Sequence, residues 1–534
     1  MPHDHDRREF LIRSGLLLAG AAVAPWWPAR AHATDSDAGG SGGNSAGGQP
    51  SVAQGLQIGD VTRGAAIVWS RTDRPARMWV EVADNAEFHG ARRVRGPYAT
   101  ESTDYTARLD LTDLPADSEL HVRVLFEDLA SAGRFSEPVT GRLRTAPAQP
   151  RNVRLLWSGD TAGQGFGINP EWGGMRIYET MRQRQPDFFI HCGDTIYADG
   201  PIPEQKTVED GRVWRNRVTP EVAKVAETLD EFRGRYRYNL LDENVRRFNA
   251  EVPQIWQWDD HEVMNNWSAA KDISADTRYT EKNVPLLLAR ATQAFLEYAP
   301  LRRMYDVEAQ RVYRRISYGP LLDVFVVDMR SYRGANSANR QAQLSEASAF
   351  LGRPQLGWLL DGLRHSQATW KIIAADMPIG LQVADGKNAD GSPRWEAIAN
   401  GEDGAPSGRE LEIAELLRGI KAAGVKNIVW LTADVHYTAA HHYAPERAAF
   451  KDFDPFWEFV SGPLNAGSFG PNALDASFGP QVVWQKAPAV QNTSPFAGLQ
   501  FFGEVNIDAA SRALSVSLRD LDDNELFSKR LEAV

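Results

Sequence analysis

Short hydrophobic runs that end beside an acidic residue recur along most of the chain. Six such runs occur, at Val153–Trp157, Asp187–His191, Gln254–Trp258, Leu321–Val327, Trp370–Ala375 and Asn427–Leu431. Runs of this length and composition are typical of buried parallel strands. Ligands bind at the carboxyl ends of such strands in open α/β sheets. We therefore expect the acidic residues that follow these runs to meet at one edge.

Helical spacing appears between the runs. Residues Gly174–Arg184 place Met175, Ile177, Tyr178 and Met181 on one face, which predicts a helix and a right-handed β-α-β crossover. Further helices are expected at Leu286–Tyr298 and Glu410–Ala423. The charged segment Pro201–Asn249 is irregular and then helical, and Gly503–Ile507 and Ala513–Asp520 alternate like a closing antiparallel pair.

Residues 52–146 have a different pattern. Short alternating segments, separated by turn residues, predict strands at Ala65–Ser70, Met78–Val82, Tyr105–Leu109, Glu119–Phe126 and Gly141–Arg144. We expect a β-sandwich that ends at Pro147–Pro150. Asp113-Leu114-Pro115 resembles the corner of an immunoglobulin or fibronectin sandwich. The segment has no cluster of ionisable residues, which favours a packing or positioning role.

The N-terminus is typical of a targeting segment. The pair Arg7-Arg8 precedes the apolar stretch Leu16–Val23 and the small-residue cleavage motif Ala31-His32-Ala33. We expect residues 1–33 to be a twin-arginine signal peptide, read by the twin-arginine export machinery, and residues 34–51 to be a flexible Gly/Ser-rich linker. The predicted location is periplasmic or secreted.

Composition limits the functions that remain. The 534 residues suffice for two domains, and the net charge of −11 disfavours a grip on nucleic acid. No apolar run reaches the roughly 18 residues of a transmembrane helix, so no stable membrane anchor is expected. The single cysteine, Cys192, excludes an intrachain disulfide and is interpreted as a buried thiol.

The acidic strand ends predict metal ions. Two unit charges about 4 Å apart repel by roughly 4 kcal/mol at an effective dielectric near 20. Several aspartates at one edge therefore need cations among them, which points to a multinuclear site and to hydrolysis. A single Asp at a strand end is more often a helix cap or turn former. Asp328 fits that description, and Arg330 and Arg333 could pair with it as easily as hold a phosphate.

Three local spacings sharpen the metal hypothesis. In Gly193-Asp194-Thr195-Ile196-Tyr197 a phenol follows a carboxylate by three positions, so both could reach one ion. Asp434-Val435-His436 supplies two ligands suited to separate ions. Asp259-Asp260-His261-Glu262 offers an oxygen ligand and, beside it, His261 as a general acid.

These phrases resemble a known family. His-Cys-Gly-Asp-Thr-Ile-Tyr-Ala-Asp, Trp-Asp-Asp-His-Glu-Val, Asp-Met-Arg-Ser-Tyr-Arg and Ala-Asp-Val-His-Tyr are similar to the alkaline phosphatase D family of calcineurin-like metallophosphatases, across residues 52–534. The resemblance implies a mixed α+β and α/β chain: a four-layer αββα catalytic domain at 150–534, preceded by an immunoglobulin- or fibronectin-like sandwich at 52–146.

The resemblance also implies two neighbouring metal sites. The first would use Asp160, Asp194, Tyr197 and His436, and the second would share Asp194 and add Asp260, Asp376 and Asp434. Two departures from the family pattern stand out: Ser158-Gly159-Asp160 replaces Ser-Cys-Gln, and Asp376-Met377-Pro378 replaces His-x-Pro. Carboxylates favour Ca²⁺, Mg²⁺ or Mn²⁺ over Zn²⁺. The resemblance and the ligand types favour Fe³⁺ plus Ca²⁺, with Mn²⁺, Mg²⁺ and Zn²⁺ left open.

The predicted function is an exported metal-dependent phosphoester hydrolase, of the alkaline phosphatase or phosphodiesterase type, that uses a metal-activated hydroxide. His261 is the predicted acid, and Arg330 and Arg333 are candidate substrate contacts. The sequence leaves open whether the substrates are small or polymeric phosphate esters, and monoesters or diesters. The alternative from another class is a secreted surface-binding protein with structural metals.

Overall fold

The computed structural model describes residues 48–304, 308 and 310–534. The expected signal peptide at 1–33 and most of the expected linker at 34–51 lie outside these residues. Within the described part of the chain, no helix combines the length and the apolar character needed to cross a membrane.

The six hydrophobic runs form six parallel strands, three in each of two sheets. In the nine-stranded sheet, β8 (Val153–Ser158), β9 (Phe188–Cys192) and β12 (Gln254–Gln257) are neighbours. In the seven-stranded sheet, β14 (Leu322–Val326), β15 (Trp370–Ala374) and β18 (Ile428–Thr432) are neighbours. The strand predictions are confirmed, and the carboxyl ends from both sheets bring the acidic residues together.

Antiparallel strands complete both sheets. The C-terminal strands β22 (Phe501–Ile507), β23 (Leu514–Asp520) and β24 (Glu525–Leu531) follow one another beside β8, so the predicted closing pair is confirmed. The seven-stranded sheet adds β13 (Arg314–Ser317), β19 (Thr438–Tyr443), β20 (Phe456–Val460) and β21 (Pro480–Lys486).

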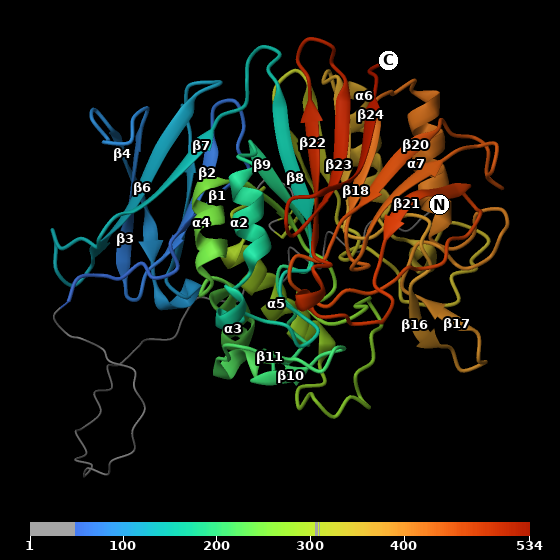
Figure 1. The fold of residues 1–534 in the computed structure, drawn as a ribbon, viewed down its shortest axis with the longest axis horizontal. Helices are drawn as coiled ribbons and strands as arrows, with labels where there is room; N and C mark the ends of the chain where they lie inside the picture. Colours follow the sequence, from blue (N-terminus) through green and yellow to red (C-terminus); the bar gives the residue numbers. More distant parts are fainter. Residues whose placement is uncertain (1–47, 305–307, 309) are drawn as a thin grey trace, which may run out of the picture. The chain divides into compact units, whose positions relative to one another are not determined.

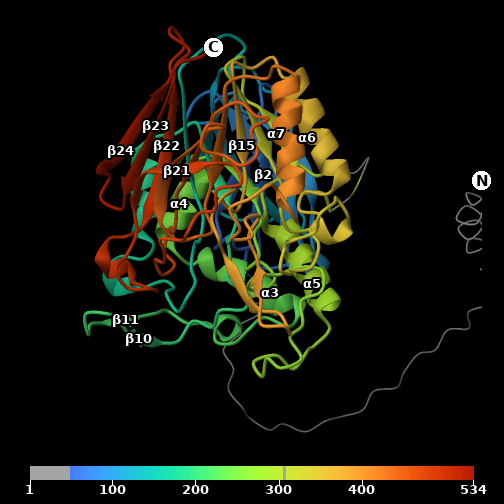
Figure 2. The same ribbon diagram turned by 90° about the vertical axis from the view of Figure 1, so that its right-hand side faces the viewer.

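Side-chain alternation on the strands builds four layers. One core lies between the sheets and includes Leu155 and Trp157 of β8 with Ile372 of β15. On the outer face of the larger sheet, Leu156 and Phe189 join a core with four helices, α2 (Arg176–Gln183), α3 (Leu229–Asn239), α4 (Glu243–Glu251) and α5 (Val284–Tyr298). Helices α6 (Arg353–His365) and α7 (Glu410–Ala422) cover the smaller sheet (Figures 1 and 2).

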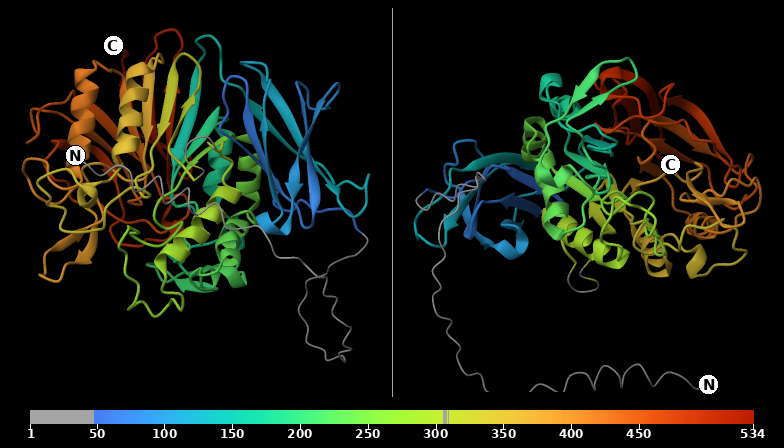
Figure 3. Two further views of the ribbon diagram at one scale, coloured as in Figure 1. Left: turned by 180° about the vertical axis from the view of Figure 1, so that it is seen from behind. Right: turned by 90° about the horizontal axis from the view of Figure 1, so that it is seen from below.

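The N-terminal strands divide between two sheets. The strands β3 (Ala76–Ala83), β4 (Arg92–Ala99), β6 (Glu119–Asp128) and β7 (Val139–Arg144) form a sheet of their own. In contrast, β1 (Leu56–Gly59), β2 (Ala66–Arg71) and β5 (Thr106–Leu111) extend the nine-stranded sheet beyond β12 (Figure 3). The parallel pairing of Gly59 with Gln254 joins them. A buried ion pair, Arg314 Nη2 to Asp60 Oδ1 at 2.6 Å, reinforces this junction.

Some elements had no clear sequence signal. β1, β4, α6 and β24 were not predicted, and neither were two hairpins, β10–β11 (Gln205–Thr207 and Val213–Arg215) and β16–β17 (Ala384–Lys387 and Pro393–Trp395). Both hairpins project at the same end of the molecule in two perpendicular views (Figures 1 and 2). The arrowhead of β22 points away from this end in Figure 1. Because β8 runs antiparallel to β22 and parallel to β9, the carboxyl ends of β8 and β9 lie at the same end as the hairpins.

Candidate metal centre

Four predicted ligands occupy an unusual backbone conformation just after their strands. The φ angles are 64° at Asp160, 54° at Asp194, 67° at Asp434 and 59° at His436. Non-glycine residues rarely adopt this left-handed region, and it clusters at functional sites where the surrounding fold enforces it. Gly193 makes the tight approach before Asp194, because a Cβ there would lie 2.4 Å from Asp259 Cβ.

The first ligand group brings Asp160, Asp194 and His436 together, with one ligand atom of each within 4.8 Å of the others. The Tyr197 hydroxyl lies 2.8 Å from Nε2 of His436. Nδ1 of His436 is 2.5 Å from the Gly467 carbonyl, to which it donates. Burial lowers the pKa of His436 to about 4, so the ring is neutral near pH 7 and presents Nε2 as a ligand.

The second group overlaps the first through Asp194. Ligand atoms of Asp194, Asp260 and His261 lie within 4.8 Å of one another, as do those of Asp259, Asp260 and Asp434. Asp259 was not predicted as a ligand. Asp376, which was, belongs to none of the three-residue groups found among the described residues; its Oδ2 accepts a hydrogen bond from Arg330 Nε at 2.8 Å.

The donor set fits hard metal cations. Five carboxylate oxygens in the cluster are buried and have no hydrogen-bond partner, namely Oδ1 and Oδ2 of Asp160, Oδ2 of Asp259, Oδ1 of Asp260 and Oδ1 of Asp376. Buried polar atoms are normally paired. Burial, together with the charge of Asp434, raises the pKa of Asp160 well above its usual range, and burial does the same at Asp194. The carboxylates therefore need cations to stay ionised together.

His261 is set up as an acid. Its Nδ1 lies 2.6 Å from Oδ1 of Asp199, whose Oδ2 accepts the Asn265 amide at 3.0 Å. Burial by itself lowers the pKa of His261, but the carboxylates of Asp199, Asp260 and Asp194 outweigh it and raise that pKa well above its usual value. The ring packs against Tyr197 with centroids 4.3 Å apart. Asp199 was missed, although it ends the Gly-Asp-Thr-Ile-Tyr-Ala-Asp phrase.

Glu262 ties two ligand loops together. Its Oε1 accepts hydrogen bonds from the backbone and the hydroxyl of Thr195, both at 2.6 Å, and its Oε2 accepts the Asp259 amide at 2.8 Å. The loop after β9 and the loop after β12 are thereby held in register. Glu262 is thus a support for the site, with both carboxylate oxygens already occupied.

A pocket of about 400 Å³ opens over the two groups. Its lining includes Asp194, Asp260, His261, Asp434 and His436. Phe469 and five amide side chains also line it: Gln164, Asn265, Asn266, Asn472 and Gln491. No lysine or arginine is among the described lining residues. The structure therefore does not place Arg330 and Arg333 where they could contact a phosphate in this pocket, as the sequence had suggested. Both side chains are fully buried and pair with Glu396.

The comparisons with known proteins agree with this geometry. The family model described as PhoD-like phosphatase matches residues 155–518, and the model of the N-terminal domain of PhoD-like phosphatases matches residues 36–147. The chain belongs to the PhoD-like phosphatase family. It is 26% identical over 470 residues to alkaline phosphatase D of Bacillus subtilis (strain 168), which covers 83% of this chain and 74% of that protein.

Two solved structures share the fold of this PhoD-like phosphatase. The structure of PhoD matches with a TM-score of 0.66 and 20% identity, covering 91% of this chain and 89% of that one. Purple acid phosphatase PPD1 from yellow lupin (Lupinus luteus) seeds matches with a TM-score of 0.54 and 11% identity, covering 91% and 74%. The predicted resemblance to the family is confirmed.

Other polar residues of the PhoD-like chain have structural roles. Asp328 Oδ1 accepts the backbone amides of Arg330 at 3.0 Å and Ser331 at 2.9 Å, as a turn former does. His191 bonds Thr161 at 2.7 Å, and His441 pairs with Glu458 at 3.0 Å. Cys192 is a buried free thiol.

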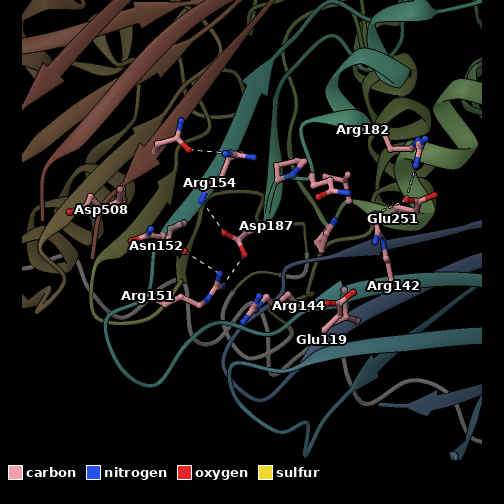
Figure 4. Close-up of a pocket in the computed structure, with 18 of the residues that line it drawn as sticks. Glu119, Arg142, Arg144, Arg151, Asn152, Arg154, Arg182, Asp187, Glu251 and Asp508 are labelled. Carbon is pink, nitrogen blue, oxygen red and sulfur yellow. Dashed lines mark hydrogen bonds and ion pairs between the residues drawn. The ribbon is translucent and has the colours of Figure 1, made fainter. Parts of the chain in front are cut away.

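A second hollow, of about 490 Å³, lies where β8 and β9 begin, at the opposite edge from the ligands (Figure 4). Its arginines already have acidic or amide partners. Arg142 and Arg182 each lie 2.9 Å from Glu251, and Arg151 lies 2.9 Å from Asp187. The arginines of this hollow are held by partners within the protein, and its lining has no group of buried carboxylates like that of the metal centre.

Proposed function

We propose that this chain is a metal-dependent phosphoester hydrolase in which His261 acts as the general acid. The observation that carries the proposal is the set of buried carboxylate oxygens without partners at strand ends of both sheets, beside a pocket that Asp194, Asp260 and Asp434 line. Family membership supports phosphate esters as the substrate class.

The metal ligands would divide into two groups around Asp194. Asp160, Asp194, Tyr197 and His436 form the mixed phenol, imidazole and carboxylate group, and Asp194, Asp260 and Asp434, with Asp259, form the carboxylate group. Two bound cations would polarise the phosphoryl oxygens and lower the pKa of an attacking water. The first group, with its phenol, imidazole and carboxylates, suits Fe³⁺. The second group suits Ca²⁺, because carboxylate oxygens favour hard cations.

The protein's own groups would handle the leaving group. Asp199 fixes the Nδ1–H of His261, so Nε2 is left to deliver a proton to the departing alkoxide. Burial raises the pKa of Asp199, yet the neighbouring His261 reverses this and lowers it to about 2, so the pair holds its charges near neutral pH. The amides on the pocket wall would contact the ester groups, since they can both donate and accept hydrogen bonds.

Export and the N-terminal strands complete the proposal. We propose that residues 1–33 are a twin-arginine signal peptide and that the protein is periplasmic or secreted. For residues 52–146 we propose an immunoglobulin- or fibronectin-like sandwich that positions the catalytic sheet. The pairing of β1 with β12 supports that role, because Asp259 and Asp260 follow β12 directly.

The test is hydrolysis of para-nitrophenyl phosphate and bis-para-nitrophenyl phosphate by the purified full chain, before and after chelation. We expect hydrolysis of at least one substrate, loss after chelation and recovery with added Fe³⁺ and Ca²⁺. Hydrolysis that survives complete metal removal would contradict metal dependence. No hydrolysis of either ester by metal-loaded protein would favour the surface-binding alternative.

A further inference from the structure

A buried guanidinium lies inside the carboxylate cluster. The Arg330 side chain is 0% exposed and forms ion pairs with Asp259, with Glu396 and, at 2.8 Å, with Asp376. Its Nη2 also lies 3.7 Å from Oδ1 of Asp434. One planar group therefore contacts the loop after β12 and lies near the loop after β18, both of which carry ligands of the second group.

The chain fixes this guanidinium from several directions. Asp328 accepts the Arg330 backbone amide, and the Asp328 amide in turn donates to Gln355 at 2.7 Å. Glu396 Oε1 also accepts from Arg333 Nη1 at 2.7 Å, and its carbonyl accepts from Arg409 Nη1 at 2.7 Å. A guanidinium held in this way has little rotational freedom. The carboxylates that it contacts are therefore oriented as well.

We infer that Arg330 is a positioning residue that orients Asp259 toward the second metal and withdraws Asp376 from the ligand set. Asp259 Oδ1 faces Arg330, which leaves its unpartnered Oδ2 for a cation. Asp376 gives Oδ2 to Arg330 and also keeps one unpartnered oxygen, Oδ1. It differs from Asp259 because it joins no three-residue ligand group among the described residues, whereas Asp259 groups with Asp260 and Asp434. This inference rests on the proposed function, since it assumes that metals bind.

The first test is the metal content of the full chain by elemental analysis. Asp376→Asn keeps an oxygen for Arg330 Nε, so we expect the wild-type ratio of metal to protein. Asp260→Asn, the matched comparison in the same cluster, should lose one metal per chain. Loss of a metal in Asp376→Asn would overturn the withdrawal of Asp376. Wild-type protein without bound metal would instead overturn the proposed function.

The second test separates positioning from charge. Arg330→Lys keeps the positive charge but cannot bridge Asp259 and Asp376. We expect the Kd for Ca²⁺, measured by calorimetry on the chelated protein, to rise about tenfold, the scale seen when a partner of a metal ligand is lost. Arg314→Lys, which changes a buried arginine paired with Asp60, is the folding control and should bind Ca²⁺ like the wild type. Unchanged Ca²⁺ affinity in folded Arg330→Lys would overturn the positioning role.

Discussion

Two hollows among the described residues are of similar size and are both lined by charged side chains, yet only one is suited to chemistry. In the hollow where β8 and β9 begin, of about 490 Å³, Arg142 and Arg151 pair with acids and Arg154 bonds the amide of Asn506. The pocket at the carboxyl ends, of about 400 Å³, lies beside a cluster of buried carboxylates, several of whose oxygens lack partners. Charge that the fold leaves unbalanced, rather than charge density or volume, distinguishes the functional site.

The largest effect is expected at the residue shared by both ligand groups. Asp194→Asn removes a charge from each group, so we expect both metals to be depleted and kcat/KM to fall by more than about 10²-fold, the scale of a lost electrostatic stabiliser. Elemental analysis measures the metal content, and phosphatase kinetics measure kcat/KM. Full metal occupancy in this variant would break the bridging assignment.

A smaller and substrate-dependent effect is expected at His261. His261→Ala should lower kcat for an alkyl ester by roughly 10²-fold, because a poor leaving group needs the proton. An aryl ester with a good leaving group should lose far less. Asp199→Asn should change the two esters in the same direction, but less strongly, since it frees the ring rather than deleting it. Equal losses on both esters in His261→Ala would argue against the acid role.

A buried acid pair away from the pocket, Glu410 and Asp475, sharpens the comparison. Here a proton on one carboxyl group, rather than a cation, relieves the repulsion between the two. Burial, with the charge of Asp475, raises the pKa of Glu410 to about 8, from an ordinary value of about 4.3. The folded state therefore favours the protonated form, and stability falls as pH rises from about 4.3 through 8.

Glu410→Gln mimics the protonated form and should remove most of this loss. We expect the wild-type Tm to fall further between pH 5 and 9 than the variant's, by on the order of 1–3 °C, in calorimetry at matched metal content. Glu446→Gln, at an exposed position, should follow the wild type. Parallel pH profiles for Glu410→Gln and the wild type would contradict the proton-sharing account.

The smallest effect is expected in the arginine-lined hollow. Arg142→Gln breaks a partly exposed ion pair with Glu251, so stability should change by about 1 kcal/mol or less and kcat/KM should stay at the wild-type value. Denaturant unfolding and the ester assay test both. A large loss of activity in this variant would break the contrast between the two hollows.

Strand periodicity revealed much of the fold, because the six runs are hydrophobic on both faces, as strands between two layers must be. The first ligand group, Asp160, Asp194, Tyr197 and His436, was implied by the resemblance to the family, and only the spacing of Asp194 and Tyr197 within it is local in sequence. The pairing of β1 with β12 depends on contacts between distant segments, and no local pattern reports it.

The second ligand group was harder to predict for an electrostatic reason. Asp376 has the same strand-end signature as Asp434, and only the fold shows that Arg330 binds it. Arg330 and Arg333 appeared suited to phosphate because the sequence does not show that they are buried. Asp199 was missed because its role is defined only by the proximity of His261.

The most direct test is anomalous X-ray diffraction from crystals of the metal-loaded full chain. The account predicts two metal peaks on either side of Asp194, one among Asp160, Tyr197 and His436, and the other among Asp259, Asp260 and Asp434. An ordered cluster with no peak between these side chains, or with metals only elsewhere, would contradict it.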